Sequence, residues 1–238
     1  MENKKRGSFS GGIGFVLAAA GSAVGLGNLW RFPYLAAQYG GGIFILVYII
    51  LALTFGFTLM TTEIAIGRKT KLSPTRAYGN IDKRFAFIGP ISFIIPVIIL
   101  PYYCVIGGWV IKYVTVFATG QDMAAADGLF FANFIGQEYA PLVFFFIFLG
   151  LTALIVVLGV EKGIEKVSKY LMPVLILLAI VICIYIMFIP GAGAGIKYYL
   201  LPDFSKFSFK TVCAAMGQMF YSMSLAMGIM ITYGSYTR

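Results

Sequence analysis

The sequence predicts an all-α polytopic membrane protein, and three observations favour this class. Hydrophobic residues make up 60% of the 238-residue chain, and charged residues only 11%. A soluble domain carries roughly 25% charged residues, because it must cover its apolar atoms in water. The apolar residues also gather into six runs, each near the ~20 residues that cross a bilayer as a helix. The basic residues stand mainly between these runs.

The six predicted spans cover about residues 11–38, 42–66, 86–117, 141–160, 171–190 and 210–235. Each should be helical, because the bilayer interior has no water to satisfy an open backbone. The segments 119–140 and 191–209 are expected as external loops. We expect no soluble domain.

Basic side chains predict how the spans are oriented. They cluster before the first span and in the loops after the second and fourth spans, at Lys4, Lys5, Arg6, Arg68, Lys69, Lys71, Arg76, Lys83, Arg84, Lys162, Lys166 and Lys169. Segment 119–140 carries three acids and no base. Because cytoplasmic loops are enriched in Lys and Arg, we expect a cytoplasmic N-terminus in a multi-pass protein of the cell (inner or plasma) membrane. The net charge of +9 is therefore interpreted as an orientation signal, with the lipid bilayer and not nucleic acid as the partner.

Two classes of chemistry find no support in the sequence. The chain has no histidine, and its three cysteines, Cys104, Cys183 and Cys213, are far apart, so no zinc or haem site is expected. We interpret the cysteines as small packing residues. No nucleophile, base and orienting residue can be assembled either, so we expect no enzyme.

The first span is interrupted by residues that a membrane helix normally avoids. The stretch AGSAVGLGNLWRFP contains three glycines, an asparagine, an arginine and a proline. Each glycine costs about 1 kcal/mol relative to alanine in a helix interior, and Arg31 costs roughly 2.5–3.5 kcal/mol at membrane depth. Close helix packing explains Gly21 and Gly25 but not Asn28 and Arg31. A nucleotide-binding loop does not match the glycine spacing.

We therefore predict that the helix is broken here. Unwound backbone frees carbonyl groups for a cation, and the half-helix that follows offers N–H groups to an anion. The span 210–235 is also interrupted by small and hydroxyl residues, at Ser222, Ser224, Ala226 and Gly228. Taken alone this second interruption is weak, because serines in membrane helices often bond back to their own carbonyls. Two interrupted spans together indicate the binding site of an inverted-repeat transporter.

At these residues the chain closely resembles the sodium:neurotransmitter symporter family, in its bacterial amino-acid branch. The matching motifs are GSAVGLGNLWRFPYLAAQYGGGIFILVY, TTEIAIGR, YYCVIGGW, GIEKVSKYLMP and FYSMSLAMGIMITYGSY. The resemblance implies the leucine-transporter inverted-repeat fold, with the first and sixth helices interrupted. It divides a single transmembrane domain over 1–238 into a cytoplasmic N-terminus (1–9), a first five-helix repeat (10–190), an extracellular loop (191–209) and the first helix of the second repeat (210–238).

Family members have roughly twelve spans in two inverted repeats, so the second repeat is expected to be truncated in these 238 residues. The helices that should complete the ion sites and pair with Arg31 and Arg6 are missing from them. A half-length transporter that assembles as a dimer is the weaker interpretation, because Arg31 would need a partner from another chain. The oligomeric state stays open.

The resemblance also implies the site residues. One sodium ion would be held by Asn28, Ser222, the Ala23 carbonyl and the substrate carboxylate, and a second by the carbonyls of Gly21 and Val24. The substrate would contact the backbone of Ala23, Gly25, Leu26 and Gly27 and the side chains of Ile99, Tyr103, Tyr221, Ser222, Ser224 and Met227. Chloride dependence stays open, although Tyr48, Gln218 and Ser222 match positions that bind chloride in animal relatives.

Gly25 bears on the substrate class. Monoamine-transporting relatives have an aspartate here, so a glycine implies that the substrate brings its own carboxylate. The apolar pocket favours a neutral, hydrophobic amino acid imported with sodium by alternating access. The alternative is an amino-acid-binding sensor that has lost transport, or a non-functional fragment.

Further residues are implied as gates and as polar supports. Arg31 and Tyr221 resemble an outer gate, and Arg6, Phe9 and Tyr236 an inner gate, where Phe9 replaces the usual tryptophan. Gln218 is expected as a structural polar residue. Glu63 should accept hydrogen bonds from backbone freed by the breaks, although a solvated helix end near Arg68 is the other interpretation.

Overall fold

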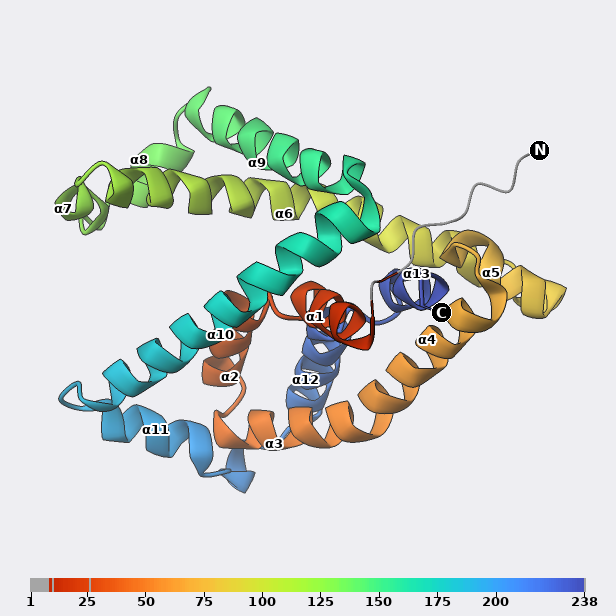
Figure 1. The fold of residues 1–238 in the computed structure, drawn as a ribbon. Helices are drawn as coiled ribbons and strands as arrows, with labels where there is room; N and C mark the ends of the chain where they lie inside the picture. The colour runs from red at the N-terminus through yellow and green to blue at the C-terminus, as the bar shows by residue number, and fades with distance from the viewer. Residues whose placement is uncertain (1–8, 10, 26, 238) are drawn as a thin grey trace. The chain divides into compact units, whose positions relative to one another are not determined.

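The computed structural model describes residue 9, residues 11–25 and residues 27–237, and all the elements in these ranges are helices (Figure 1). The first group is α1 (Gly12–Ala23), the π-helix η1 (Gly27–Arg31), α2 (Phe32–Gln38), α3 (Gly42–Leu51), the π-helix η2 (Ala52–Gly56) and α4 (Phe57–Thr70). The second group is α5 (Pro74–Ile81), the 3-10 helix η3 (Lys83–Phe85), α6 (Ile88–Ala118), α7 (Asp122–Ala125), α8 (Phe130–Ile135) and α9 (Ala140–Val157). The third group is the π-helix η4 (Val160–Glu165), α10 (Lys166–Met187), α11 (Ala192–Leu200), the 3-10 helix η5 (Phe204–Lys206), α12 (Phe209–Ser222) and α13 (Ile229–Ser235).

The lengths of these helices fit a membrane protein with two broken spans. Four helical stretches within the described ranges are long and apolar enough to cross a bilayer, at Gly42–Thr70, Lys83–Ala118, Ala140–Val157 and Val160–Met187. Gly12–Ala23 and Gly27–Gln38, which are bent by 48° at the break between them, are together long and apolar enough for a fifth span. The sixth predicted span appears as α12 and α13, and each piece is too short to cross alone. The predicted interruptions of the first and sixth helices are confirmed.

One predicted boundary is wrong. The sequence led us to expect a span over 171–190 preceded by a cytoplasmic loop, but helix is continuous over Val160–Met187. Lys162, Lys166 and Lys169 are exposed on this helical extension, whereas Gly163 and Glu165 are buried. The lysines gave the segment the polarity of a loop, although its other face packs against protein. Hydropathy cannot distinguish a loop from a helix that continues past the apolar region.

The chain divides into two compact units, residues 1–92 with 160–238, and residues 93–159. In the second unit α6 approaches the α9 backbone closely at Gly108, where an added Cβ would lie 2.8 Å from the Phe145 nitrogen. The ammonium of Lys112 lies 5.6–5.9 Å from three ring centroids, those of Phe130, Phe134 and Phe144. Cation–π attraction therefore holds α8 and α9 against α6 within this unit.

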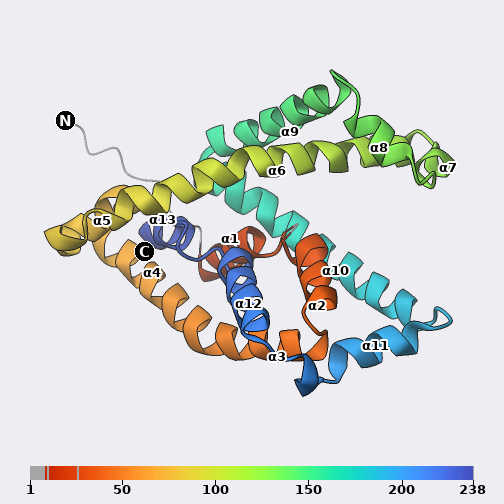
Figure 2. The same cartoon turned by 180° about the vertical axis from the view of Figure 1, so that it is seen from behind.

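The first unit contains both broken spans. Its helices contact one another in pairs, with α12 beside α3, α13 beside α4 and α1 beside α10 (Figures 1 and 2). Buried Leu35, Ala36, Phe44 and Ala215 form a core cluster between α2, α3 and α12. These contacts place the two breaks next to each other inside one packed unit.

Candidate functional site

The first break begins where α1 ends at Ala23. Val24 has extended backbone angles (φ −96°, ψ 105°), so the α-helical path stops, although its N–H still bonds to the Ala20 carbonyl at 2.7 Å. The chain resumes as η1, where the N–H groups of Asn28 and Leu29 both bond to the Gly25 carbonyl, at 3.0 and 3.2 Å. The side-chain Nδ2 of Asn28 donates to the Ala23 carbonyl at 3.1 Å. Asn28 thus bridges the two ends of the break.

The second break lies between α12 and α13. Ser224 (φ 54°) and Ala226 (φ 60°) adopt the left-handed conformation, which costs an L-residue roughly 1–2 kcal/mol. Gly228 (φ 71°) adopts it as well, at no such cost, and precedes α13. Two non-glycine residues in this conformation require outside contacts to hold them there.

Those contacts come from two other helices. The Ser224 Oγ donates to the Ser22 carbonyl at 2.9 Å and lies 3.2 Å from the Ser22 Oγ. The Ala226 N–H donates to Glu63 Oε1 at 2.8 Å. The two breaks are therefore bonded directly to each other, and the second is also bonded to α4. Glu63, predicted to accept bonds from freed backbone, lies in that position and is buried.

Asn28 and Ser222 present oxygen atoms with spare acceptor capacity. The Oδ1 of Asn28 is buried and has no hydrogen-bond partner in the described part of the chain. The Ser222 Oγ donates its one proton to the Gln218 carbonyl at 2.6 Å, so Tyr48, at 2.9 Å, must donate to Ser222. An unpaired buried amide oxygen is costly, and it fits a hard cation, which prefers oxygen ligands.

Arg31 and Gln218 form a chain of hydrogen bonds that ends at the backbone of the first break. The Arg31 NH1 donates to Gln218 Oε1 at 3.2 Å, and Gln218 Nε2 donates to the Gly27 carbonyl at 2.9 Å. The guanidinium also lies 5.1 Å from the centroid of the Tyr221 ring. Arg31, expected to need a partner from missing helices, therefore has two partners within this chain. A Cβ added at Gly27 would lie 2.6 Å from Tyr221 Cδ1, so only glycine fits beneath the ring.

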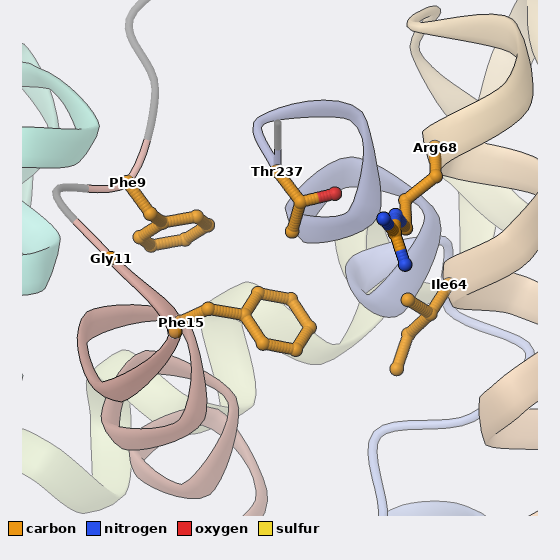
Figure 3. A pocket seen from close by; sticks show the side chains of 7 residues that line it. Phe9, Gly11, Phe15, Ile64, Arg68 and Thr237 are labelled. Carbon is orange, nitrogen blue, oxygen red and sulfur yellow. The ribbon is translucent and has the colours of Figure 1, made fainter.

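Phe9, just before α1, and Tyr236, just after α13, are in contact with each other. The Phe9 N–H donates to the Tyr236 carbonyl at 3.3 Å, and the Phe9 ring packs edge-to-face on Phe15, Tyr233 and Tyr236. Phe9, Phe15, Ile64 and Arg68 are among the residues that line an adjacent pocket of about 340 Å³. Figure 3 shows Phe9 and Phe15 on one side of this pocket and Ile64 and Arg68 of α4 on the other. Arg6, the remaining predicted gate residue, lies outside the described residues.

The carbonyl-bearing residues predicted for a second sodium ion line a different cavity. Gly21 and Val24 border a space of about 490 Å³ between α1 and α10. Ser168 and Met172 of α10 border it as well. An added Cβ at Gly21 would lie 3.1 Å from the Ser168 hydroxyl, so α1 approaches α10 closely at that glycine.

Not all predicted substrate residues are brought together. Ala23, Tyr221, Ser222, Ser224 and Met227 belong to the two breaks or their flanks, and a Cβ on Gly25 would meet no atom within 4 Å. Leu26 lies outside the described residues. Ile99 and Tyr103 stand on α6 in the second unit, so their contribution to the site stays a prediction.

Sequence reasoning gave no role to two residues of this region. Ser22 forms both bonds to Ser224, and the only signal for it was a hydroxyl residue just before the break. Glu165 is only 4% exposed, and its carboxylate lies against Gly14, where an added Cβ would collide with it. An acid among the lysines of a supposed loop was the signal for Glu165.

Two broken helices joined at their breaks, in an all-helical apolar chain, are typical of the inverted-repeat transporter fold. Residues 6–124 and 132–238 match the sodium:neurotransmitter symporter family, and the chain belongs to this family. The resemblance predicted from the sequence is thereby confirmed.

Three individual relatives support the membership of the chain in this family. The chain is 36% identical over 241 residues to an uncharacterized sodium-dependent transporter, YhdH, of Bacillus subtilis, covering 99% of this chain and 53% of that protein. It is 37% identical over 247 residues to another of Methanocaldococcus jannaschii, covering 99% of this chain and 50% of the relative. The taurine transporter of Bos taurus, described as sodium- and chloride-dependent, is 29% identical over 272 residues, or 95% of this chain and 44% of that one.

A solved structure confirms the fold. The crystal structure of MhsT in complex with L-phenylalanine superposes with a TM-score of 0.91 and 37% identity, covering 98% of this chain and 54% of MhsT. The predicted leucine-transporter fold is therefore confirmed. The chain spans about half the length of the curated relatives it matches.

Proposed function

We propose that the complete protein is a symporter that imports a neutral, hydrophobic amino acid together with Na⁺ by alternating access. The observation that carries this proposal is the buried Oδ1 of Asn28 at the junction of two broken helices, which has no hydrogen-bond partner among the described residues. The family is one of sodium-dependent transporters, which supports the coupling ion. The relatives are transporters and not enzymes.

The oxygen atoms of the site fit sodium. In the proposal, Asn28 Oδ1, the Ala23 carbonyl and the Ser222 hydroxyl hold one ion, because each is an uncharged oxygen with acceptor capacity. The carbonyls of Gly21 and Val24 contribute to a second. Bound Na⁺ supplies positive charge for the carboxylate of the substrate.

We assign the substrate to the α-amino acids because residue 25 is a glycine. No side chain at this position offers a negative charge, and space is open around it, so the substrate brings its own carboxylate. The N–H groups of the half-helix that begins at Gly27 would receive that carboxylate, aided by the helix dipole. MhsT was crystallised with L-phenylalanine, which supports a hydrophobic amino acid here. Tyr221 and Met227 would form part of an apolar wall.

In the proposal, aromatic residues at the outer and inner ends of the broken helices act as gates. Tyr221 with Arg31 would close the outer path, and Phe9 with Tyr236 the inner path, with the N-terminus in the cytoplasm. Each inward Na⁺ gains about 2.3 kcal/mol per 100 mV of membrane potential. Two ions therefore suffice for steep accumulation of substrate.

The test is uptake of a panel of labelled neutral amino acids into proteoliposomes that contain the full-length protein. We expect uptake that needs an inward Na⁺ gradient, and we expect Asn28→Ala to raise the Na⁺ concentration for half-maximal uptake. Asn133→Ala, an exposed amide on α8, is the matched control and should behave as wild type. Binding without accumulation would instead indicate a sensor. Uptake that is independent of Na⁺ would refute the proposal.

A further inference from the structure

The connection between α4 and α6 lies at the edge of the membrane. One apolar span ends at Thr70 and the next begins at Lys83, so the short stretch between them stays close to the bilayer surface. Residues 68–84 include six basic residues and one acid. A basic cluster directly beside a membrane span is typical of a surface that binds anionic lipid headgroups.

This connection is folded against the rest of its unit. α5 contacts both α4 and α13, and Ala77 of α5 is fully buried, at 0% exposure. An added Cβ on Gly89 would lie 2.6 Å from the Thr75 carbonyl oxygen, so α6 begins directly against α5. Pro74 lies against Gly228 at the second break, where an added Cβ would lie 2.5 Å from the Pro74 Cγ. The exposed side chains of α5 and η3 are therefore held on a packed support.

Apolar and basic side chains stand together on the exposed surface of this segment. Ile81, Phe85 and Phe87 are 48%, 50% and 60% exposed. Arg76 and Lys83 are exposed as well. At a membrane surface, exposed rings can enter the boundary of the acyl chains while long basic side chains reach the phosphates. A soluble anion would gain nothing from the three apolar side chains, so the combination favours a phospholipid.

The positive charges of this segment are not equally available to a ligand. The Arg84 guanidinium forms an ion pair with Asp82 at 2.8 Å, and its Nε also donates to that carboxylate at 3.1 Å. The backbone N–H of Arg84 bonds to Asp82 Oδ1 at 2.9 Å. Among the described residues, neither Arg76 nor Lys83 has an ion-pair partner. These two bases therefore remain available to a phosphate.

We propose that residues 74–87 bind the headgroup of an anionic phospholipid, with Arg76 and Lys83 contacting the phosphate. The three exposed apolar side chains contact the acyl chains. Asp82 limits the affinity, because it pairs with the third base, Arg84. In the predicted orientation this site faces the inner leaflet. The proposal depends neither on the substrate nor on the coupling ion.

The experiment measures lipid binding to the purified full-length protein in detergent by native mass spectrometry. The probes are phosphatidylglycerol, which is anionic, and phosphatidylcholine, which has no net charge. Arg76→Gln combined with Lys83→Gln should weaken binding of phosphatidylglycerol about 25-fold, or about 5-fold for each base, and leave phosphatidylcholine unchanged. Lys162→Gln combined with Lys166→Gln removes the same charge from exposed positions on another helical stretch. This matched control should bind both lipids as wild type does.

Asp82→Asn is expected to act in the opposite direction. It keeps the oxygen that accepts from the Arg84 N–H but removes the charge that pairs with the guanidinium. Binding of phosphatidylglycerol should therefore become up to about 5-fold tighter. Glu161→Gln, which removes an exposed acid beside Lys162, is the control and should leave the affinity unchanged. A gain of affinity cannot result from damage to the fold.

Three outcomes would overturn the proposal. The first is an equal loss of phosphatidylglycerol binding in both double variants, which would show a diffuse effect of charge. The second is unchanged binding in Arg76→Gln with Lys83→Gln, or in Asp82→Asn. The third is displacement of the lipid by an equal concentration of glycerol 3-phosphate, which would show a site for a soluble anion. We expect no such displacement.

Discussion

Glu63 Oε1 accepts a 2.8 Å hydrogen bond from the backbone N–H of Ala226, so a carboxyl group of α4 fastens the break between α12 and α13. The other oxygen, Oε2, is buried without a partner in the described part of the chain. Ionisable residues within the membrane are expensive and are usually retained for function. Here the carboxyl group of Glu63 helps to hold the backbone of Ala226 in a left-handed conformation, at φ 60°.

Removal of this carboxyl group should destabilise the fold. Glu63→Ala leaves the Ala226 N–H unpaired, which should cost about 1–3 kcal/mol of unfolding free energy. Glu63→Gln keeps an acceptor oxygen and should lose less. The measurement is thermal unfolding of purified protein in detergent, with exposed Glu138→Ala as the control. Equal melting temperatures for Glu63→Ala and wild type would show that the bond contributes nothing.

Replacement of Ala226 by glycine should have the opposite effect. Glycine adopts φ 60° without the Cβ clash, so Ala226→Gly should gain up to about 1 kcal/mol of stability despite its greater unfolded-state entropy. The control Ala194→Gly, inside α11, should lose up to about 1 kcal/mol. Both are measured by thermal unfolding. Destabilisation by Ala226→Gly equal to that of the control would mean that residue 226 is not left-handed.

Gly67 allows α4 to contact α13 closely. An added Cβ would lie 2.9 Å from the Ser235 nitrogen and would collide with the Ile231 carbonyl. Because backbone cannot rotate away, Gly67→Ala should cost about 1–3 kcal/mol through overpacking. Gly217→Ala, in α12, meets no atom within 4 Å and should be neutral or stabilising. Unfolding midpoints in detergent test the pair, and a tolerated Gly67→Ala would argue against this helix contact.

Gly25 should control the substrate class. Gly25→Asp places a carboxylate where the substrate carboxylate is expected, and like charges repel, so amino-acid uptake should fall at least about 10-fold. Gly25→Ala adds only a methyl group in open space and should retain part of the uptake. Sodium-driven uptake into proteoliposomes measures both. Wild-type uptake by Gly25→Asp would place the carboxylate elsewhere.

The orientation of the chain is tested by labelling single cysteines. With Cys104, Cys183 and Cys213 replaced by alanine, Asp127→Cys should react with a membrane-impermeant maleimide in intact cells, because segment 119–140 is expected outside. Lys83→Cys should react only after permeabilisation. The reverse pattern would show that the N-terminus faces outward and that the basic residues do not set the orientation.

The sequence by itself determined the class of the protein, the spans and the positions of the breaks. Composition and apolar run length depend only on the order of residues, and so does the conflict between Asn28 or Arg31 and a lipid environment. These local features were enough to predict the interrupted first helix, whereas the weaker signal in the sixth helix gained its support from the family resemblance. The boundary at 171 failed because burial of Gly163 and Glu165 depends on what packs against that helix.

The tertiary structure decided which polar atoms meet across the breaks. Ser22 and Ser224 are separated by 202 positions, and Glu63 and Ala226 by 163. No local pattern encodes such a pairing, because hydrogen bonds depend on atoms brought within about 3 Å by the packing of whole helices. The left-handed angles of Ser224 and Ala226 were also invisible in the sequence. They exist because bonds from α1 and α4 stabilise a conformation that neither residue prefers.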